Sequence, residues 1–231
     1  KTINRGRDIA PLYVQFGEEI SGYDYFLHVH SKKSVYSGKE QYGWRRYSLD
    51  CLLKDEETVK KIFAVFESTN IGLFYPETFG EMPIIAQDWL ENAGGGRKLL
   101  AELGIPFEDG FFNYPVGSFF WARTDAVKPV FDRRLKYDDF PPESGQTDGT
   151  LAHILERAIA FVSRSRGYID AIHDIRSDYI MLGKSYKAYE RYFAVNTDNA
   201  KMYLSNFDVI SFDIFDTLIT RKVYMPDDIF K

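Results

Sequence analysis

Short apolar runs alternate along this chain with longer stretches of helical periodicity, and this alternation limits the folds that it can adopt. Runs rich in β-forming residues predict strands over Tyr25–His30, Ile71–Tyr75 and Gly117–Ala122. Apolar residues at helical spacing predict helices over 49–68, 97–103, 125–131 and 150–166. Strands that alternate with helices are typical of an α/β fold with a mixed, mainly parallel sheet flanked by helices.

Turn and cap signals refine this pattern. The acidic run 55–57 lies inside the window 49–68, which can therefore hold two helices with an acidic second start. The run Gly94–Gly96 indicates a turn, and Thr124 suits the N-cap of the helix that follows it. Residues 169–205 are tyrosine-rich and less regular, which indicates a connector.

Charge and cysteine content exclude several classes of protein. The 231 residues carry 29 basic and 34 acidic side chains, and this net charge of −5 is a poor match to a nucleic-acid backbone. Cys51 is the single cysteine, so no internal disulfide can form. No apolar run approaches the roughly 20 residues that a membrane span needs. The chain begins at Lys1 and continues directly into polar sequence, so we expect a fragment of a longer protein.

The first candidate ligand-binding segment is the turn around Gly6, which includes Asn4, Arg7 and Asp8. A glycine between two arginines can form a tight turn beside an anionic ligand, because the guanidinium group presents a planar fork of donors that fits phosphate. The alternative is a solvated turn that Asp8 caps.

The second candidate segment follows the first predicted strand. Alternation along a strand places His28 and His30 on one face, and ligands of open α/β sheets lie outside the carboxyl ends of strands. Lys32 and Lys33 can neutralise a diphosphate as point charges. Two histidines are few for zinc, which takes three or four protein ligands, so we predict no metal site here.

Two aromatic segments could complete the same cleft. The segment at Trp44 and Arg45 could add an indole and a guanidinium group to the cleft, or it could be an ordinary amphipathic helix start. The segment that begins with Gly117 and Ser118 allows a ligand to lie close to the backbone. The candidate residues in the two segments are Trp44, Arg45, Gly117, Ser118, Trp121 and Arg123.

Carboxylates supply candidate catalytic groups. Asp148 lies on a glycine-flanked turn ahead of the long helix, where it could act as a base or bind a sugar hydroxyl. His153, one turn into that helix, would point toward the same mouth. The alternative for Asp148 is helix capping, which Thr147 or Thr150 could also provide. Near the end of the chain, Asp213 follows an apolar strand and could be a carboxylate nucleophile.

Five of these motifs together resemble the rhamnan synthesis F family, and they span Asn4 to His153. They are Asn-x-Gly-Arg-Asp-Ile-Ala-Pro, His-x-His-Ser-Lys-Lys-Ser, Gly-Trp-Arg, Pro-x-Gly-Ser-x-Phe-Trp-x-Arg and Gly-Gln-x-Asp-Gly-Thr-Leu-Ala-His. Members of that family are implicated in assembling rhamnose-rich bacterial cell-surface polysaccharides and are similar to glycosyltransferases of the GT-A kind. The tail, with Asp213, Asp216 and Thr217, resembles the first motif of haloacid dehalogenase-like hydrolases.

These resemblances imply a domain plan. We expect a glycosyltransferase-like domain over 1–185, a connector over 186–205 and the truncated start of a haloacid dehalogenase-like domain over 206–231. Because the chain starts at the Asn-x-Gly-Arg-Asp motif, we expect it to lack the opening βαβ unit of a GT-A domain. The Asp-x-Asp metal motif common in GT-A enzymes does not occur in the sequence. The resemblance therefore leaves a divalent metal open and makes no cofactor certain.

The function that the resemblance implies is transfer of a sugar, with rhamnose suggested, from a nucleotide-sugar donor to a glycan acceptor. It implies no nucleic-acid partner, and a cytoplasmic location with peripheral association at the inner face of the membrane. The alternative is a non-catalytic carbohydrate-recognition or scaffold module. A phosphohydrolase based on Asp213 is a third hypothesis, although Phe215 stands where phosphatases of that family usually carry a second aspartate.

Overall fold

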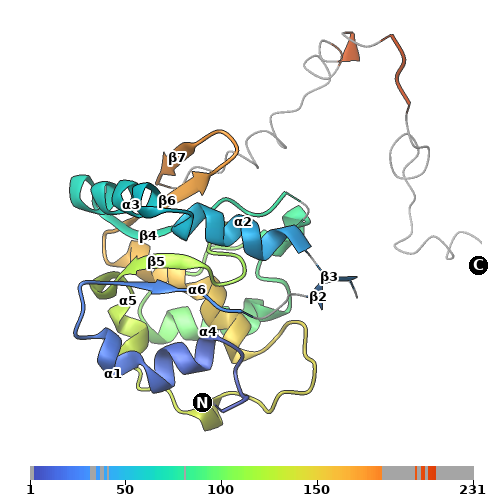
Figure 1. Ribbon diagram of the computed structural model, residues 1–231. Helices are drawn as coiled ribbons and strands as arrows, with labels where there is room; N and C mark the ends of the chain where they lie inside the picture. Colours follow the sequence, from blue (N-terminus) through green and yellow to red (C-terminus); the bar gives the residue numbers. More distant parts are fainter. Residues whose placement is uncertain are drawn as a thin grey trace, which may run out of the picture. The chain divides into compact units, whose positions relative to one another are not determined.

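The computed structural model describes residues 3–31, 35–36, 39–40, 42–80, 82–183, 201, 204–205 and 208–211. The chain divides into two compact units, Lys1–Ser185 and Tyr186–Lys231. The first unit is an α/β domain in which helices flank a mixed sheet (Figure 1). The tail motif at Asp213, Asp216 and Thr217 lies outside the described residues.

The elements of the first unit follow one another in an alternating order. The strands are β1 (Tyr25–His28), β2 (Val35–Tyr36), β3 (Lys39–Glu40), β4 (Ile71–Pro76), β5 (Phe120–Arg123), β6 (Ile169–Asp174) and β7 (Tyr179–Leu182). The helices are α1 (Gly17–Ile20), α2 (Tyr42–Leu53), α3 (Glu56–Ser68), α4 (Ala93–Glu102), α5 (Thr124–Phe131) and α6 (Leu151–Ser165). A π-helical turn covers Pro11–Gln15, and 3-10 turns cover Ile84–Gln87, Leu90–Asn92 and Tyr137–Asp139.

The main sheet of the described residues has the strand order β1-β5-β4-β6-β7. Within it, β4 and β6 pair in parallel, whereas the other three neighbouring pairs are antiparallel. The prediction of a mainly parallel sheet is therefore wrong, although the α/β class is confirmed. All six residues of β4 are buried, which is typical of a parallel strand, yet β4 also pairs with the antiparallel β5. An apolar run predicts burial and not strand direction.

The strands that the sequence predicted are present, with shifted ends. The first ends at His28 instead of His30, and the third begins at Phe120 instead of Gly117. Gly117 and Ser118 have φ angles of +85° and +60°, which belong to the left-handed region and not to a strand. The backbone therefore turns sharply just before β5.

The window 49–68 holds parts of two helices, as its acidic centre indicated. Asp55 caps α3 by accepting a 2.8 Å hydrogen bond from the Thr58 N–H. The expected N-cap at Thr124 is wrong by one residue, because α5 begins at Thr124 and its N-cap is Arg123.

The prediction of a turn at Gly94–Gly96 is also wrong, because these glycines form the first turns of α4. A Cβ atom on Gly95 would lie 2.2 Å from Ile154 Cδ1, and one on Gly96 would lie 2.5 Å from Trp89 Cζ3. The glycines thus allow α4 to approach α6 and the Trp89 indole closely. Here glycine serves helix packing rather than a turn.

Residues 169–205 are not simply a connector, because β6 and β7 lie at their start. Polar residues interrupt the apolar pattern of β6. Asp170 is nevertheless buried there, where it accepts hydrogen bonds from Arg164 Nε at 3.1 Å and from the Tyr75 hydroxyl at 2.9 Å. Because Asp170 is polar yet buried, the hydrophobicity of the segment alone does not predict this strand.

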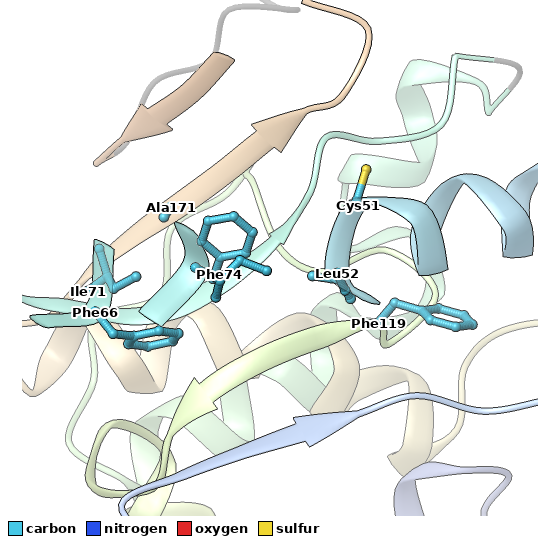
Figure 2. Packing of buried hydrophobic residues seen from close by; sticks show 8 residues of the cluster. Cys51, Leu52, Phe66, Ile71, Phe74, Phe119 and Ala171 are labelled. Atoms are coloured by element: carbon cyan, nitrogen blue, oxygen red, sulfur yellow. The ribbon is translucent and has the colours of Figure 1, made fainter. Parts of the chain in front are cut away.

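Two helical layers cover the sheet (Figure 1). Helices α2 and α3 lie on one face, and α5 and α6 lie on the other, with α4 packed against α6. Under α2 and α3 the core contains Cys51, Leu52, Phe66, Ile71 and Phe74 (Figure 2). The high aromatic content is partly used for packing, since the buried Trp89 ring lies against Phe107, Phe112 and Phe161.

The described helices contain no segment that is both long and apolar enough to cross a bilayer.

Candidate functional site

A cavity of about 790 Å³ opens beyond the end of β1. This volume lies within the range of small-molecule sites, which is about 300–1,000 Å³. Its walls come from the turn at 7–9, from His30 and Trp44, from the loop 114–118, and from residues of 82–91 and 143–157. Segments far apart in the sequence therefore share one concave surface.

The turn before Asp8 is fixed by backbone geometry. Gly6 and Arg7 have φ angles of +68° and +56°, and a Cβ atom on Gly6 would lie 2.4 Å from Ala10 Cβ. The Arg7 N–H donates a 3.0 Å hydrogen bond to Glu143 Oε1, and the Arg7 guanidinium donates to the Gln146 carbonyl. These contacts position Asp8 in the cavity wall.

The two histidines after β1 are held by the turn before β5. His28 Nδ1 donates to the Ser118 carbonyl at 2.6 Å, and His30 Nε2 donates to the Gly117 carbonyl at 2.7 Å. Asp8 Oδ2 lies 3.9 Å and 4.0 Å from the two Nε2 atoms. Burial lowers the pKa of His28, and the nearby Asp8 charge partly opposes this shift.

Among the described residues, no group of three or more His, Cys, Asp or Glu side chains has the geometry to hold a metal ion. The ring nitrogens instead fix the position of the turn at Gly117 and Ser118.

That turn carries an unusually close aromatic contact. A Cβ atom on Gly117 would lie 2.5 Å from Trp44 Cζ2, so a glycine is needed where the indole crosses the backbone. The Gly117 N–H donates to Glu156 Oε1 at 2.7 Å. Burial raises the pKa of Glu156, and the Arg157 charge opposes this shift.

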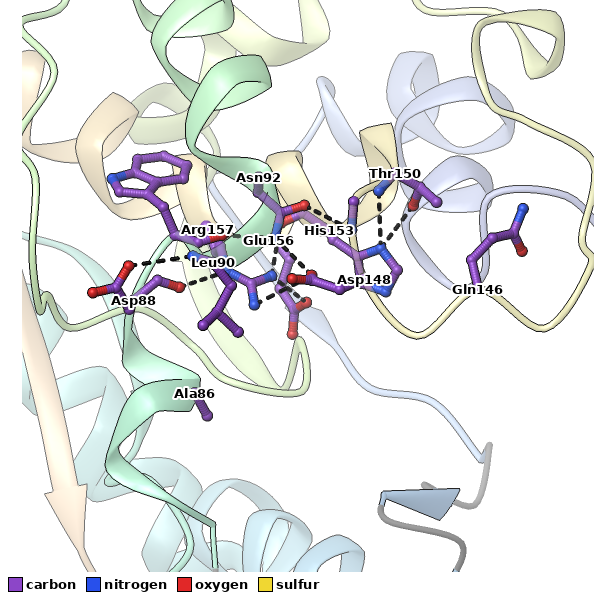
Figure 3. Close-up of polar contacts among 12 residues, drawn as sticks. Ala86, Asp88, Leu90, Asn92, Gln146, Asp148, Thr150, His153, Glu156 and Arg157 are labelled. Carbon is purple, nitrogen blue, oxygen red and sulfur yellow. Dashed lines mark hydrogen bonds and ion pairs between the residues drawn. The ribbon is translucent and has the colours of Figure 1, made fainter. Parts of the chain in front are cut away.

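Asp148, another residue of the cavity wall, is held by a polar network (Figure 3). Its Oδ1 accepts a 2.6 Å hydrogen bond from Asn92 Nδ2 and lies 3.5 Å from Arg157 Nη2. Asn92 Oδ1 also accepts from the Gly149 N–H at 3.2 Å, which ties down the turn. Asp148 Oδ2 has no hydrogen-bond partner among the described residues.

His153 lies one turn into α6, where it completes a capping box with Thr150. The Thr150 N–H donates to His153 Nδ1 at 3.3 Å. Burial, together with the Arg7 charge, lowers the pKa of His153 to about 4. The ring is therefore neutral near pH 7, and its Nε2 has no partner in the described part of the chain.

Sequence reasoning missed two residues of the cavity wall, Glu156 and Arg157, and the buried Asn92, which lies behind the wall and holds Asp148. Arg157 is only 5 % exposed and donates from Nε to the Asp88 carbonyl at 3.0 Å. Its spacing of four residues from His153 on one helix places both on the same face, so the helical pattern could have identified it. Asn92 has no comparable signal in the sequence.

Eight of the residues that the sequence singled out line the cavity. These residues are Arg7, Asp8, His30, Trp44, Gly117, Ser118, Asp148 and His153. His28 lies behind them, where it contacts Ser118. Lys32 and Lys33 lie outside the described residues.

Four other predicted residues do not line the cavity. Asn4 and Arg45 are exposed elsewhere, and Arg45 donates to the Ser31 carbonyl at 3.1 Å. Trp121 packs against Phe63. Arg123 donates to the Phe66 carbonyl at 2.9 Å and so caps the end of α3. Alternation along β5 explains this placement, because Trp121 and Arg123 share the face that α3 covers.

Comparison with known proteins gives the family. The model of the family described as rhamnan synthesis protein F matches residues 1–168, which include every described residue that lines the cavity. Two proteins of Xanthomonas campestris pv. campestris, from strains B100 and ATCC 33913, are both named uncharacterized protein WxcX. Each is 31 % identical over 166 residues, which make up 71 % of this chain and 24 % of the relative. The chain thus spans about a quarter of the length of these relatives, and no solved structure matches it. The chain belongs to the rhamnan synthesis protein F family, and this membership implies a part in polysaccharide synthesis.

Proposed function

We propose that this domain transfers a sugar, with rhamnose the first candidate, from a nucleotide-sugar donor to a growing bacterial surface polysaccharide. The observation that carries the proposal is the arrangement of Asp148. One of its oxygens is held by Asn92 and Arg157, and the other has no partner among the described residues. A carboxylate fixed in this way is suited to accept a proton from an acceptor hydroxyl.

In the proposed step, the oxygen of the acceptor hydroxyl attacks the anomeric carbon of the donor sugar. The hydroxyl proton passes to Asp148 Oδ2. The bond between the anomeric carbon and the diphosphate oxygen breaks, and the nucleoside diphosphate leaves with the bonding electrons. Arg157 and Asn92 act as positioning residues, because they hold the carboxylate that receives the proton.

The donor's diphosphate needs cations, and the described lining supplies few of them. Arg7 lies in the cavity wall, although Glu143 and Gln146 engage it. Lys32 and Lys33, which follow β1 in the sequence, remain the predicted diphosphate contacts. The role of Asp213 in a haloacid dehalogenase-like domain likewise stays a prediction from the sequence.

The test is a transfer assay with a nucleotide-sugar donor and a rhamnan oligosaccharide acceptor. The change Asp148→Asn should lower the transfer rate about 100-fold or more, because general base catalysis typically contributes 10²–10⁴-fold. The change Asp132→Asn is the matched control, since Asp132 is an exposed carboxylate that pairs with Lys128. Unchanged turnover in Asp148→Asn would refute the proposed base.

A second candidate function is a non-catalytic carbohydrate-recognition module. It is favoured by the charge of the lining, which includes five carboxyl groups and two guanidinium groups among the described residues. Carboxylates suit sugar hydroxyls and repel phosphate. Glycan binding without any turnover of nucleotide sugars, measured in the intact protein, would decide for this function.

A further inference from the structure

Four buried polar atoms on side chains of the cavity have no hydrogen-bond partner among the described residues. They are Asp8 Oδ2, His30 Nδ1, Asp148 Oδ2 and His153 Nε2. An unpaired buried polar group costs about 1–3 kcal/mol, so such groups are rare in native proteins. Buried atoms elsewhere in the described residues, such as the Tyr47 and Ser163 hydroxyl oxygens, also lack a partner, but four such atoms lie on side chains of one cavity, where a ligand can supply their partners.

The partners of the two rings determine what each free atom can do. A carbonyl can only accept, so His30 Nε2 donates to Gly117. In the tautomer that carries its proton on Nε2, Nδ1 is left as an acceptor. A backbone N–H can only donate, so His153 Nδ1 accepts from the Thr150 N–H at 3.3 Å, and the Thr150 hydroxyl, 2.8 Å away, acts as a second donor to it. In this tautomer of the neutral ring, Nε2 is left as a donor. With the two carboxylate oxygens, the cavity offers three acceptors and one donor.

We propose that this cavity binds a neutral polyol, a sugar ring that donates hydroxyl protons to Asp8, His30 and Asp148 and accepts a hydrogen bond from His153. Each hydroxyl can donate one hydrogen bond and accept others, so a ring with three free hydroxyls matches all four atoms. This inference rests on the proposed function, because that function is the reason for taking the polyol to be a sugar.

A diphosphate does not match the same atoms. An ionised phosphate only accepts hydrogen bonds, so it could satisfy His153 but would leave Asp8, His30 and Asp148 unpaired. It would also meet a lining in which carboxyl groups outnumber guanidinium groups. The pyrophosphate of a donor is therefore bound outside this cavity, and the cavity selects a sugar ring.

The test is calorimetric titration of the full chain at pH 7.5 with methyl α-L-rhamnopyranoside and, separately, with thymidine diphosphate. The changes Asp8→Asn and Asp148→Asn should each weaken glycoside binding about tenfold or more, because each removes a charged acceptor. The surface change Asp132→Asn should alter it less than about twofold. Singly deoxygenated glycosides, titrated into the unaltered chain, should bind more weakly for each hydroxyl that the site uses.

The signs of the effects separate the two ligand classes. Neutralising Asp8 or Asp148 should weaken the binding of a polyol. The same change would strengthen the binding of an anion in this cavity. The inference would be overturned if thymidine diphosphate bound both variants more tightly than the unaltered chain and the glycoside did not bind at all. Glycoside affinity that neither variant nor any deoxygenation changes would overturn it too. Glycoside binding that behaves as expected, with no sugar transfer, would refute the proposed transfer reaction alone.

Discussion

His153 links the stability of the domain to pH. Its pKa is about 4 in the folded chain and about 6.5 when unfolded. Burial and the charges of Arg7 and Arg157 lower the pKa, and the charges of Asp148 and Glu143 partly oppose this shift. The unfolded chain therefore binds more protons between these values. The stabilisation from the neutral ring is complete above pH 6.5 and is lost as the pH falls toward 4. From pH 7.5 to pH 5 we expect His153 to lower the free energy of unfolding by about 2 kcal/mol.

Urea denaturation at the two pH values measures this loss. In His153→Asn, whose amide oxygen can still accept from the Thr150 N–H, the pH dependence should be smaller by about that amount. His28, with a lowered pKa, and Glu156, with a raised pKa, stay the same in both proteins, so their contributions cancel in the comparison. Identical pH dependence in the two proteins would show that His153 does not titrate as we infer.

At the scale of elements, alanine substitutions at two of the three glycines of α4 should have opposite effects on stability. A Cβ atom on Gly96 would lie 2.5–2.9 Å from three atoms of the buried Trp89 ring, which cannot move aside cheaply. Gly96→Ala should therefore lower the free energy of unfolding by about 1–3 kcal/mol. Gly94 has no atom within 4 Å of such a Cβ, so Gly94→Ala should raise it by up to about 1 kcal/mol. Thermal denaturation that shows equal effects would contradict the packing argument.

The same glycines show what local sequence signals can and cannot predict. Apolar periodicity identified α6, α3 and only the last part of α2, because one buried face determines such a pattern. It could not show that Gly94–Gly96 is helical, because that depends on Trp89 and Ile154 across the interface. It also could not give the direction of β5. Nor could it reveal β6, where the buried Asp170 is stabilised by hydrogen bonds from Tyr75 of β4 and Arg164 of α6.

At the scale of the whole molecule, the candidate site joins segments that local patterns cannot bring together. The motifs predict one cleft for Arg7, Asp8, His30, Lys32, Lys33, Arg123 and Asp148. Arg7, Asp8, His30 and Asp148 do line one cavity, whereas Lys32 and Lys33 lie outside the described residues. Arg123 was predicted with them but caps α3. The difference lies in the register of β5, which sets the face of each side chain and is fixed by pairing with β1 and β4. Motif order alone does not contain that register.

The arrangement of the first unit predicts where the chain can be shortened. Every described residue that lines the cavity lies between Arg7 and Arg157, and β7 ends at Leu182. A chain that stops at Ser185 should therefore unfold in urea within about 1 kcal/mol of the full chain and retain the binding of methyl α-L-rhamnopyranoside. A chain that stops at Asp174 is the matched control. It lacks β7, whose residues pair along β6 and whose Met181 is buried, so it should be clearly less stable. Equal stability of the two shortened chains would contradict the role of β7, and loss of binding at Ser185 would show that residues beyond the first unit contribute to the site.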